Sequence, residues 1–166
     1  MHQNSLLCTG KEFAELYQRN KDMVYRMCLL YLKNSADAED ATQSIFLKVL
    51  NSSKTFNGLE HEKAWFITAT KNHCRDILKS WWKNRRVNLD SITETAHWDD
   101  TETGEAVAKI FLLPEKYRVV LYLFYAEGYP IKEIATMLNR KETTVKVQLS
   151  RGREQLKIDL GGNGNE

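Results

Sequence analysis

The sequence predicts an all-α protein made of two small helical domains joined by an acidic linker, the C-terminal one a helix-turn-helix. Apolar residues recur at helical spacing along most of the chain, and the only prolines are Pro114 and Pro130. Glycines gather near the expected helix ends and in the tail. Of the 166 residues, 42% are apolar and 28% are charged, which is the composition of a folded globular protein.

Two amphipathic segments begin the chain. Residues 11–33 carry apolar side chains at helical spacing and are expected to form the first helix. In the second segment, residues 34–51, we expect Ser35 to cap the helix and Asp37 to lie favourably at the positive end of its dipole. This second helix has one apolar stripe, which consists of Ala38, Ala41, Ile45 and Val49.

A loop and a third helix complete the first half. Residues 52–61 are rich in Ser and contain Asn and Gly, so we expect a loop there. Residues 62–82 are expected to form a long helix that holds most of the basic residues of this half. We assign three of its side chains to the core: Phe66, Ile67 and Leu78.

Charge is distributed unevenly, although the net charge is only +2. Residues 63–86 contain seven Lys or Arg and one acid, whereas residues 90–105 contain six acids and no Lys or Arg. Helical periodicity is lost in the acidic stretch, which we interpret as a linker in the form of a soluble, charged tether. The predicted division is a domain at 1–86, the linker at 87–105, a domain at 106–160 and a disordered tail at 161–166.

Four short helices are expected in the second half. The first, residues 106–112, stops before Pro114; the second, residues 115–126, ends at Gly128; and Pro130 lies in the first turn of the third. The third helix has the apolar stripe Ile131, Ile134, Ala135 and Leu138. Asn139 can adopt the left-handed conformation that ends this helix, and a basic helix follows at once. Two short helices joined by a tight turn, the second basic, form a helix-turn-helix.

The basic helix has two distinct faces. On a helical wheel its apolar residues point to the domain core: Val145, Leu149, Gly152 and Leu156. The opposite face is small and polar in the middle and is flanked by Lys146 and Arg151. Small side chains permit close approach to base edges, and flanking cations can neutralise phosphates or donate to guanine. The alternative is a plain solvated helix, but the preceding helix and turn favour DNA binding.

Three segments resemble one known family. The segment LPEKYRVVLYLFYAEGYPIKEIATMLNRKETTVKVQLSRGREQLK closely resembles the C-terminal DNA-binding domain of bacterial sigma factors. In sigma factors, a helix of the N-terminal domain binds core RNA polymerase, and this helix is similar to the segment DAEDATQSIFLKV. The promoter-opening segment of sigma factors is similar to KAWFITATKNHCRDIL. Over residues 11–158 the chain thus resembles the extracytoplasmic-function (ECF) group of the sigma-70 family. The resemblance implies a subunit that directs promoter-specific transcription initiation and performs no chemistry itself.

Site residues in the first domain follow from this resemblance. Binding to the polymerase, at the β′ clamp helices, is implied for Asp40, Gln43 and Leu47. Recognition and melting of the −10 element are implied for Phe56, Asn57 and His61 in the loop and for Trp65, Asn72, Arg75, Lys79 and Lys83 on the third helix. Opening DNA calls for aromatic platforms for unstacked bases and cations for the backbone. Packing is the alternative for Trp65, and also for Trp81 and Trp82, which stand where relatives often carry arginines.

The basic helix is the implied reader of the −35 element. The matching positions are Thr144, Lys146, Val147, Ser150 and Arg151, with Arg153 expected on a phosphate. Val147 replaces a common Ser, which suggests contact with a thymine methyl group. In the turn, Arg140 and Lys141 replace residues that are apolar and Ser in relatives, and both are candidates for contact with the DNA backbone.

Other expectations concern partners and chemistry. The resemblance implies core polymerase (β′ clamp helices and β flap), promoter DNA and an anti-sigma factor as partners. We expect no metal, because the spacing typical of metal-ligating residues is missing, and we expect no cofactor or small-molecule substrate. We also expect a cytoplasmic protein with reduced thiols at Cys8, Cys28 and Cys74. No apolar run approaches the roughly 18 residues that span a membrane. The alternatives are an autonomous helix-turn-helix regulator and a nuclease using His73 and Asp76.

Overall fold

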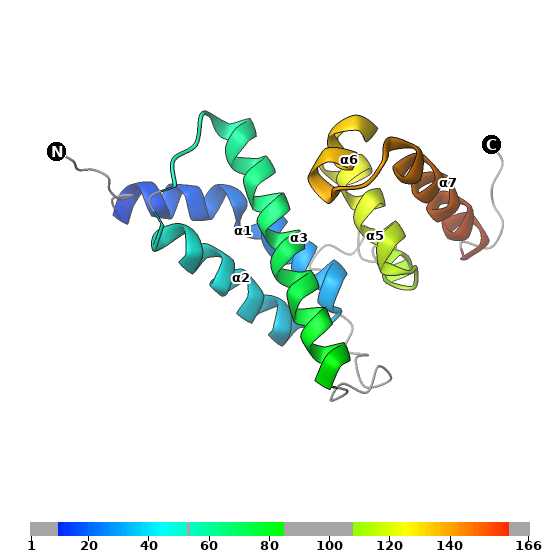
Figure 1. Cartoon of the computed structure of the whole chain (residues 1–166), viewed down its shortest axis with the longest axis horizontal. Coiled ribbons are helices and arrows are strands. Elements are labelled where there is room, and N and C mark those ends of the chain that lie inside the picture. Colours follow the sequence, from blue (N-terminus) through cyan, green and yellow to red (C-terminus); the bar gives the residue numbers. More distant parts are fainter. Residues whose placement is uncertain (1–9, 53, 85–107, 160–166) are drawn as a thin grey trace. The chain divides into compact units, whose positions relative to one another are not determined.

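The chain divides into two compact units, Met1–Glu94 and Thr95–Glu166. The computed structural model describes residues 10–52, 54–84 and 108–159, and within these ranges every regular element is a helix (Figure 1). The all-α prediction is therefore confirmed. The predicted linker at 87–105 and the tail at 161–166 lie outside the described residues, as does Cys8. None of the described helices is both long and apolar enough to cross a membrane.

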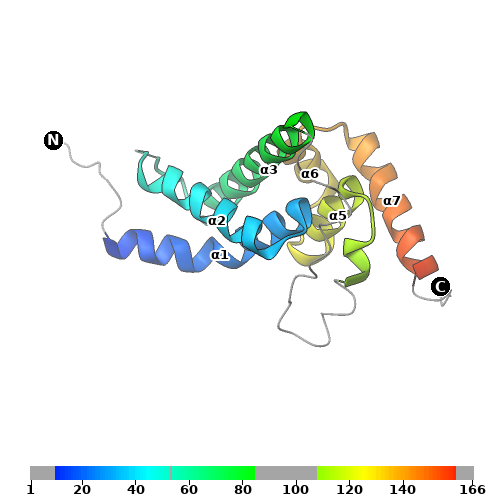
Figure 2. The same cartoon turned by 90° about the horizontal axis from the view of Figure 1, so that it is seen from below.

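Unit 1 is built on three helices, α1 (Gly10–Leu32), α2 (Ser35–Leu50) and α3 (Leu59–Asn84). The first of them packs against both of the others, as Figures 1 and 2 show from two directions. The predicted stripe of α2 is buried at all four positions, and Phe66 and Ile67 of α3 are fully buried beside it in the core. Leu78, which was expected in the core, is only half-buried.

Two local predictions for unit 1 are wrong. Asn34 and not Ser35 caps α2, because the Asn34 backbone is extended and its Oδ1 accepts a hydrogen bond of 2.9 Å from the Asp37 N–H. The third helix begins at Leu59, so His61 belongs to its first turn and not to the loop. Gly58 explains the early start, since its φ of +110° suits glycine and its carbonyl accepts from the Glu62 N–H at 3.1 Å.

A buried carboxylate ties α3 to α1. Glu62 leaves 5% of its surface exposed and accepts two hydrogen bonds from Arg19, at 3.0 and 2.8 Å, and one from Asn20 Nδ2 at 2.7 Å. Burial alone would raise the pKa of the Glu62 carboxyl. The hydrogen bonds from Arg19 and Asn20 and the charge of Arg19 outweigh burial and hold this pKa below its ordinary value of 4.5.

This arrangement predicts a pH-dependent stability. A carboxyl whose pKa is lower in the folded state stabilises the fold above its unfolded pKa, and the contribution is lost as the pH falls through the folded pKa. We expect Glu62→Gln to lower the free energy of unfolding by about 1–2 kcal/mol above pH 5. Below pH 4.5 the difference in the free energy of unfolding between the variant and wild type should narrow. Urea denaturation between pH 3 and pH 7 measures the gap. The exposed Glu60→Gln on the same turn is the control, and an identical pH profile for both variants would contradict the account.

Unit 2 contains α5 (Glu115–Leu121), the π-helical segment η2 (Tyr122–Ala126), α6 (Ile131–Leu138) and α7 (Glu142–Asp159). Residues 108–111 add a single helical turn before Pro114. The predicted helix 115–126 is thus not α-helical throughout. Its last turn is wider: the Glu127 N–H bonds to the Tyr122 carbonyl, and the Tyr122 hydroxyl donates to the Glu127 carboxylate. The chain then reverses at Gly128, whose φ is +77°.

The helix-turn-helix forms as predicted. Asn139 has φ 57° and ψ 51°, so it ends α6 in the left-handed conformation. Val145 and Leu149 are buried, while Leu156 is half-buried. Gly152 lets α7 lie close to α5, because a β-carbon there would come within 2.9 Å of Leu121 Cδ1. These contacts fix which face of α7 stays exposed.

Candidate nucleic-acid interface

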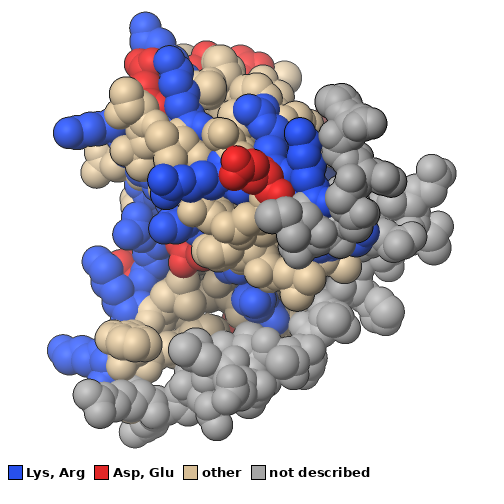
Figure 3. All heavy atoms as spheres, turned by 90° about the vertical axis from the view of Figure 1, so that its right-hand side faces the viewer, with Lys and Arg blue, Asp and Glu red and all other residues tan. Residues whose placement is uncertain are grey.

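The outward face of α7 carries all the residues expected to contact the −35 element. Each of them is exposed: Thr144, Lys146, Val147, Ser150, Arg151 and Arg153. Val147 leaves 46% of its surface exposed, which leaves its methyl groups available to an apolar contact such as a thymine methyl. The side of the molecule that carries α7 shows Lys and Arg side chains spread over its described part (Figure 3).

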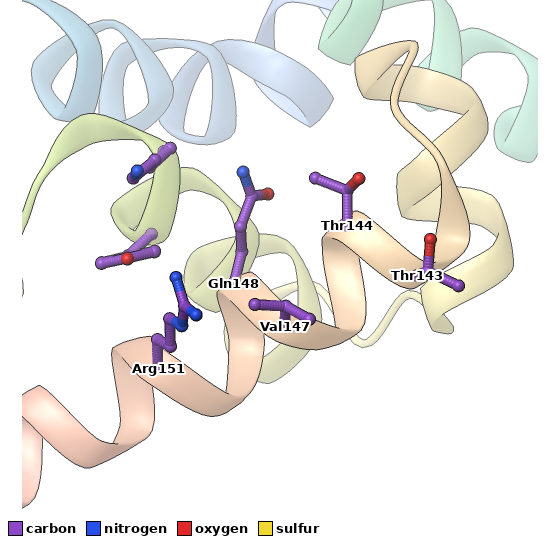
Figure 4. A pocket seen from close by; sticks show the side chains of 7 residues that line it. Thr143, Thr144, Val147, Gln148 and Arg151 are labelled. Atoms are coloured by element: carbon purple, nitrogen blue, oxygen red, sulfur yellow. The ribbon is translucent and has the colours of Figure 1, made fainter.

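A hollow of about 340 Å³ lies between α7 and the start of α5 (Figure 4). Its lining consists of Lys116 and Tyr117 of α5 and Thr143, Thr144, Val147, Gln148 and Arg151 of α7. The hollow therefore gathers three of the expected −35 residues, while Lys146, Ser150 and Arg153 do not line it. Sequence reasoning missed Gln148 and Lys116. Gln148 lies about 100° from Val147 around the helix, at the edge of the predicted face. Lys116 belongs to α5, which is distant from α7 in the sequence.

Two of the arginines expected to contact DNA, Arg140 and Arg153, are held by protein groups. Arg140, a candidate for contact with the DNA backbone, donates from Nη1 to Gln148 Oε1 at 2.7 Å and to the Lys116 carbonyl at 3.3 Å. It thus connects the turn to both α5 and α7. Arg153, at the exposed edge of α7, donates from Nη1 to the Tyr125 hydroxyl at 2.8 Å. Both guanidinium groups have several donors, so neither contact uses up its hydrogen-bonding capacity.

Six of the eight residues expected to contact the −10 element lie on α3, and five of these six form one stripe along it. His61, Trp65, Asn72, Lys79 and Lys83 fall within about 40° on a helical wheel, and Arg75 lies beside them. From His61 to Lys83 the stripe runs roughly 33 Å along the helix axis. The ring-bearing residues stand at its N-terminal end and the lysines at its C-terminal end.

An aromatic cluster forms the N-terminal end of this stripe. The Phe56 ring lies 5.7 Å from the Trp65 ring and 5.5 Å from the His61 ring, and Trp65 rests edge-on against the buried Phe66 at 5.2 Å. Phe56 and Trp65 are half-buried, so packing against the core holds them while part of each ring stays accessible. The Asn57 N–H donates to His61 Nδ1 at 2.9 Å, which leaves the proton of a neutral imidazole on Nε2.

The expected polymerase-binding residues share one face of α2. Asp40, Gln43 and Leu47 are exposed and lie within about 60° around the helix. Leu47 leaves 53% of its surface exposed. The face continues to Leu50, which is 41% exposed and was not predicted. An apolar side chain at the centre of a polar face is the arrangement expected of a protein–protein contact.

Comparison with known families identifies the chain. The family description "Sigma-70 region 2" matches residues 16–84, and "Sigma-70, region 4" matches residues 110–156. The RNA polymerase sigma factor SigV of Bacillus subtilis is 30% identical over 146 residues, which cover 85% of this chain and 86% of SigV. The chain belongs to the ECF group of sigma-70 family sigma factors. The ECF sigma factor SigX of the same organism is 26% identical to it, over 87% of this chain and 81% of SigX.

Two solved structures have a fold similar to that of this sigma factor. The sigma factor RpoE of Bartonella quintana, in its complex with the anti-sigma factor NepR, superposes with a TM-score of 0.71 at 18% identity. The match covers 93% of this chain and 99% of RpoE. CnrH in complex with the cytosolic domain of CnrY gives a TM-score of 0.64, also at 18% identity. At this identity the likeness concerns the fold alone.

The tryptophans at the end of α3 differ in exposure. Trp81 is half-buried, as packing at the end of unit 1 requires, whereas Trp82 leaves 76% of its surface exposed. The packing alternative therefore fails for Trp82.

His73, which the nuclease alternative requires, lies 3.4 Å by its Nδ1 from Lys48 Nζ of α2. Burial and the charge of Lys48 lower the pKa of His73, and Asp76 opposes this only in part. The sigma factor thus keeps this imidazole in a contact between α2 and α3.

Proposed function

We propose that this sigma factor binds core polymerase through α2 and positions two DNA-contacting faces, α3 and α7, on one promoter. The observation that carries the proposal is that each unit presents its own exposed face suited to nucleic acid, while unit 1 presents a further, partly apolar face on α2. Polymerisation would be performed by the polymerase alone. The protein would work in the cytoplasm, where the chromosome and the polymerase are.

The α3 stripe is suited to the −10 element. Unstacked bases gain about 1–3 kcal/mol each by stacking on aromatic side chains, and a backbone phosphate is attracted by lysine. Phe56 and Trp65 would accept bases at one end, with the amide of Asn72 next along the stripe. Lys79 and Lys83 would hold the backbone of the adjoining duplex at the other end. Arg75, beside the stripe, would add a further phosphate contact.

The α7 face is suited to the major groove of duplex DNA at the −35 element. Arg151 would donate to a base edge and Val147 would contact a methyl group, while Lys146 and Ser150 lie on the opposite flank of the same face. Thr144 would reach the DNA from within the hollow. Arg153, held by Tyr125, would meet a phosphate.

The α2 face would contact the β′ clamp helices through Asp40, Gln43 and Leu47. Unit 2 would contact the β flap, and an anti-sigma factor would cover the same surfaces when the protein is inactive. The matched complex of RpoE with the anti-sigma factor NepR supports this last proposal by analogy.

On the polymerase, the two DNA-contacting faces would be held at a fixed spacing, so binding of one face to the promoter raises the effective concentration of the other. The free protein lacks this gain and is expected to bind promoter DNA weakly. An autonomous helix-turn-helix regulator would instead bind duplex DNA tightly without polymerase, usually as a dimer on two half-sites. Comparing DNA affinity with and without core polymerase separates the two cases.

The proposed polymerase contact is tested at Gln43. We expect Gln43→Ala to weaken binding to core polymerase about three- to tenfold, because a hydrogen bond at an interface is worth about 1 kcal/mol. Gln18→Ala, which removes an exposed glutamine from α1, is the matched control and should bind like wild type. Fluorescence anisotropy of labelled protein gives the affinities. Equal affinity of the Gln43 variant and wild type would remove Gln43 from the interface.

A further inference from the structure

Gln148 is held in one orientation in the hollow of unit 2. Its Oε1 accepts the 2.7 Å hydrogen bond from Arg140 Nη1, and the same nitrogen lies 3.3 Å from the Lys116 carbonyl of α5. Both Gln148 and Arg140 are half-buried. The side chain reaches from α7 into the hollow beside Val147 and Arg151, as Figure 4 shows.

The chemistry of arginine decides which end of the amide remains available. A guanidinium group has donors and no acceptor, so the glutamine atom that faces it must be the oxygen. The Nε2 group of Gln148 is therefore on the other side, and no described residue accepts a hydrogen bond from it. An unrestrained glutamine can both donate and accept, which is how it pairs with adenine through N7 and N6. In this position the oxygen of Gln148 is turned toward Arg140, so the end of the amide left to meet a base is the donor Nε2.

We propose that Gln148 determines base specificity at the α7 interface and that Arg140 is a positioning residue, which holds the Gln148 oxygen and leaves the donor Nε2 to meet a base. The proposal rests on the proposed role of α7 in reading the −35 element. It assigns to the turn arginine a function other than binding the DNA backbone.

The donor character predicts which bases are accepted. Guanine offers O6 and N7, thymine offers O4 and adenine offers N7 as acceptors in the major groove, whereas cytosine presents only the donor N4. The neighbouring Arg151 is also a donor, so the hollow favours base edges rich in acceptors, guanine above all. Gln148 should disfavour cytosine at one base pair of the −35 element by about fivefold, the lower end of the range for a base contact.

Two substitutions at Gln148 separate its chemistry from its packing. Gln148→Ala should remove the discrimination at that one base pair and leave the other positions unchanged. Gln148→Glu can still accept from Arg140 but has no donor left, so it should reverse the preference toward cytosine, whose N4 donates to carboxylates. A residue with only a structural role would not reverse a base preference.

Arg140→Ala should free the Gln148 oxygen and raise binding of adenine or cytosine at the same base pair. Lys141→Ala is the matched control: it removes one charge from the same turn, at an exposed position, without this hydrogen bond. It should change overall affinity and its salt dependence only, as expected for a phosphate contact.

The experiment selects bound sequences from duplexes randomised across the −35 element, using the full chain with core polymerase. A change of preference confined to one base pair and shared by the Gln148 and Arg140 variants supports the proposal. Unchanged selected sequences, or uniform weakening of all of them, would overturn it while leaving the proposed function intact. If wild type selects no sequence, the proposed function and this inference both fail. Thermal unfolding of each variant verifies that it is folded.

Discussion

Replacing Phe66 by alanine is expected to lower the free energy of unfolding of unit 1 by about 3–5 kcal/mol. Phe66 has no exposed surface, and its ring lies 4.9 Å from Phe46 and 5.2 Å from Trp65. Truncation removes apolar area from the core and leaves a cavity that these two large rings cannot fill without moving. Because Trp65 and Phe56 rest on Phe66, the same change should also loosen the proposed base-stacking cluster.

Urea denaturation followed by circular dichroism at 222 nm measures this effect without relying on tryptophan fluorescence. Trp82→Ala is the control, since it removes a larger aromatic side chain from the same helix at a position that is 76% exposed. It should change the free energy of unfolding by less than about 0.5 kcal/mol. Comparable losses for both variants would show that α3 does not pack as described.

Replacing Leu47 by alanine is expected to weaken binding to core polymerase about 30-fold, which corresponds to about 2 kcal/mol. The side chain is 53% exposed in the free chain and lies on the same face of α2 as Asp40 and Gln43. Burying such a leucine at the centre of an interface, with polar neighbours around it, is the usual arrangement of a binding hot spot. The stability of the free protein should change little, because the side chain contributes little to the core.

Leu59→Ala is the matched control for this prediction. Leu59 is also a leucine in unit 1 and is 64% exposed, but it stands in the first turn of α3. Titration of labelled variants with core polymerase should give wild-type affinity for Leu59→Ala and the large loss for Leu47→Ala alone. Equal losses would point to a general effect of surface apolarity and not to a contact through α2.

Much of the fold followed from periodicity and from residues with few conformational choices. The α2 stripe, for example, could be predicted because burial repeats every three to four residues. Asn139 could be predicted as the end of α6 because asparagine tolerates the left-handed region. The cap of α2 could not, since Asn34 and Ser35 are both good caps and only the backbone conformation chooses between them.

The candidate sites show the same limit. The predicted face of α7 is exposed because its opposite side is apolar, and this is visible in the sequence. The proposed role of Gln148 is not visible in the sequence. It depends on a contact with Arg140 across the turn and on Lys116 of α5, which lines one side of the hollow. Likewise, the wide turn of η2 is accompanied by the pairing of Tyr122 with Glu127, and nothing in the local spacing requires it.

The central claim is that this sigma factor directs core polymerase to a promoter through two separate DNA contacts. Run-off transcription from a library of randomised promoters, with purified core polymerase and the full chain, tests it most directly. We predict transcripts that start at a fixed distance from two conserved sequence elements with a constant spacing, and none from core polymerase alone. Transcripts without a shared two-part sequence, or initiation that does not require the chain, would contradict the account.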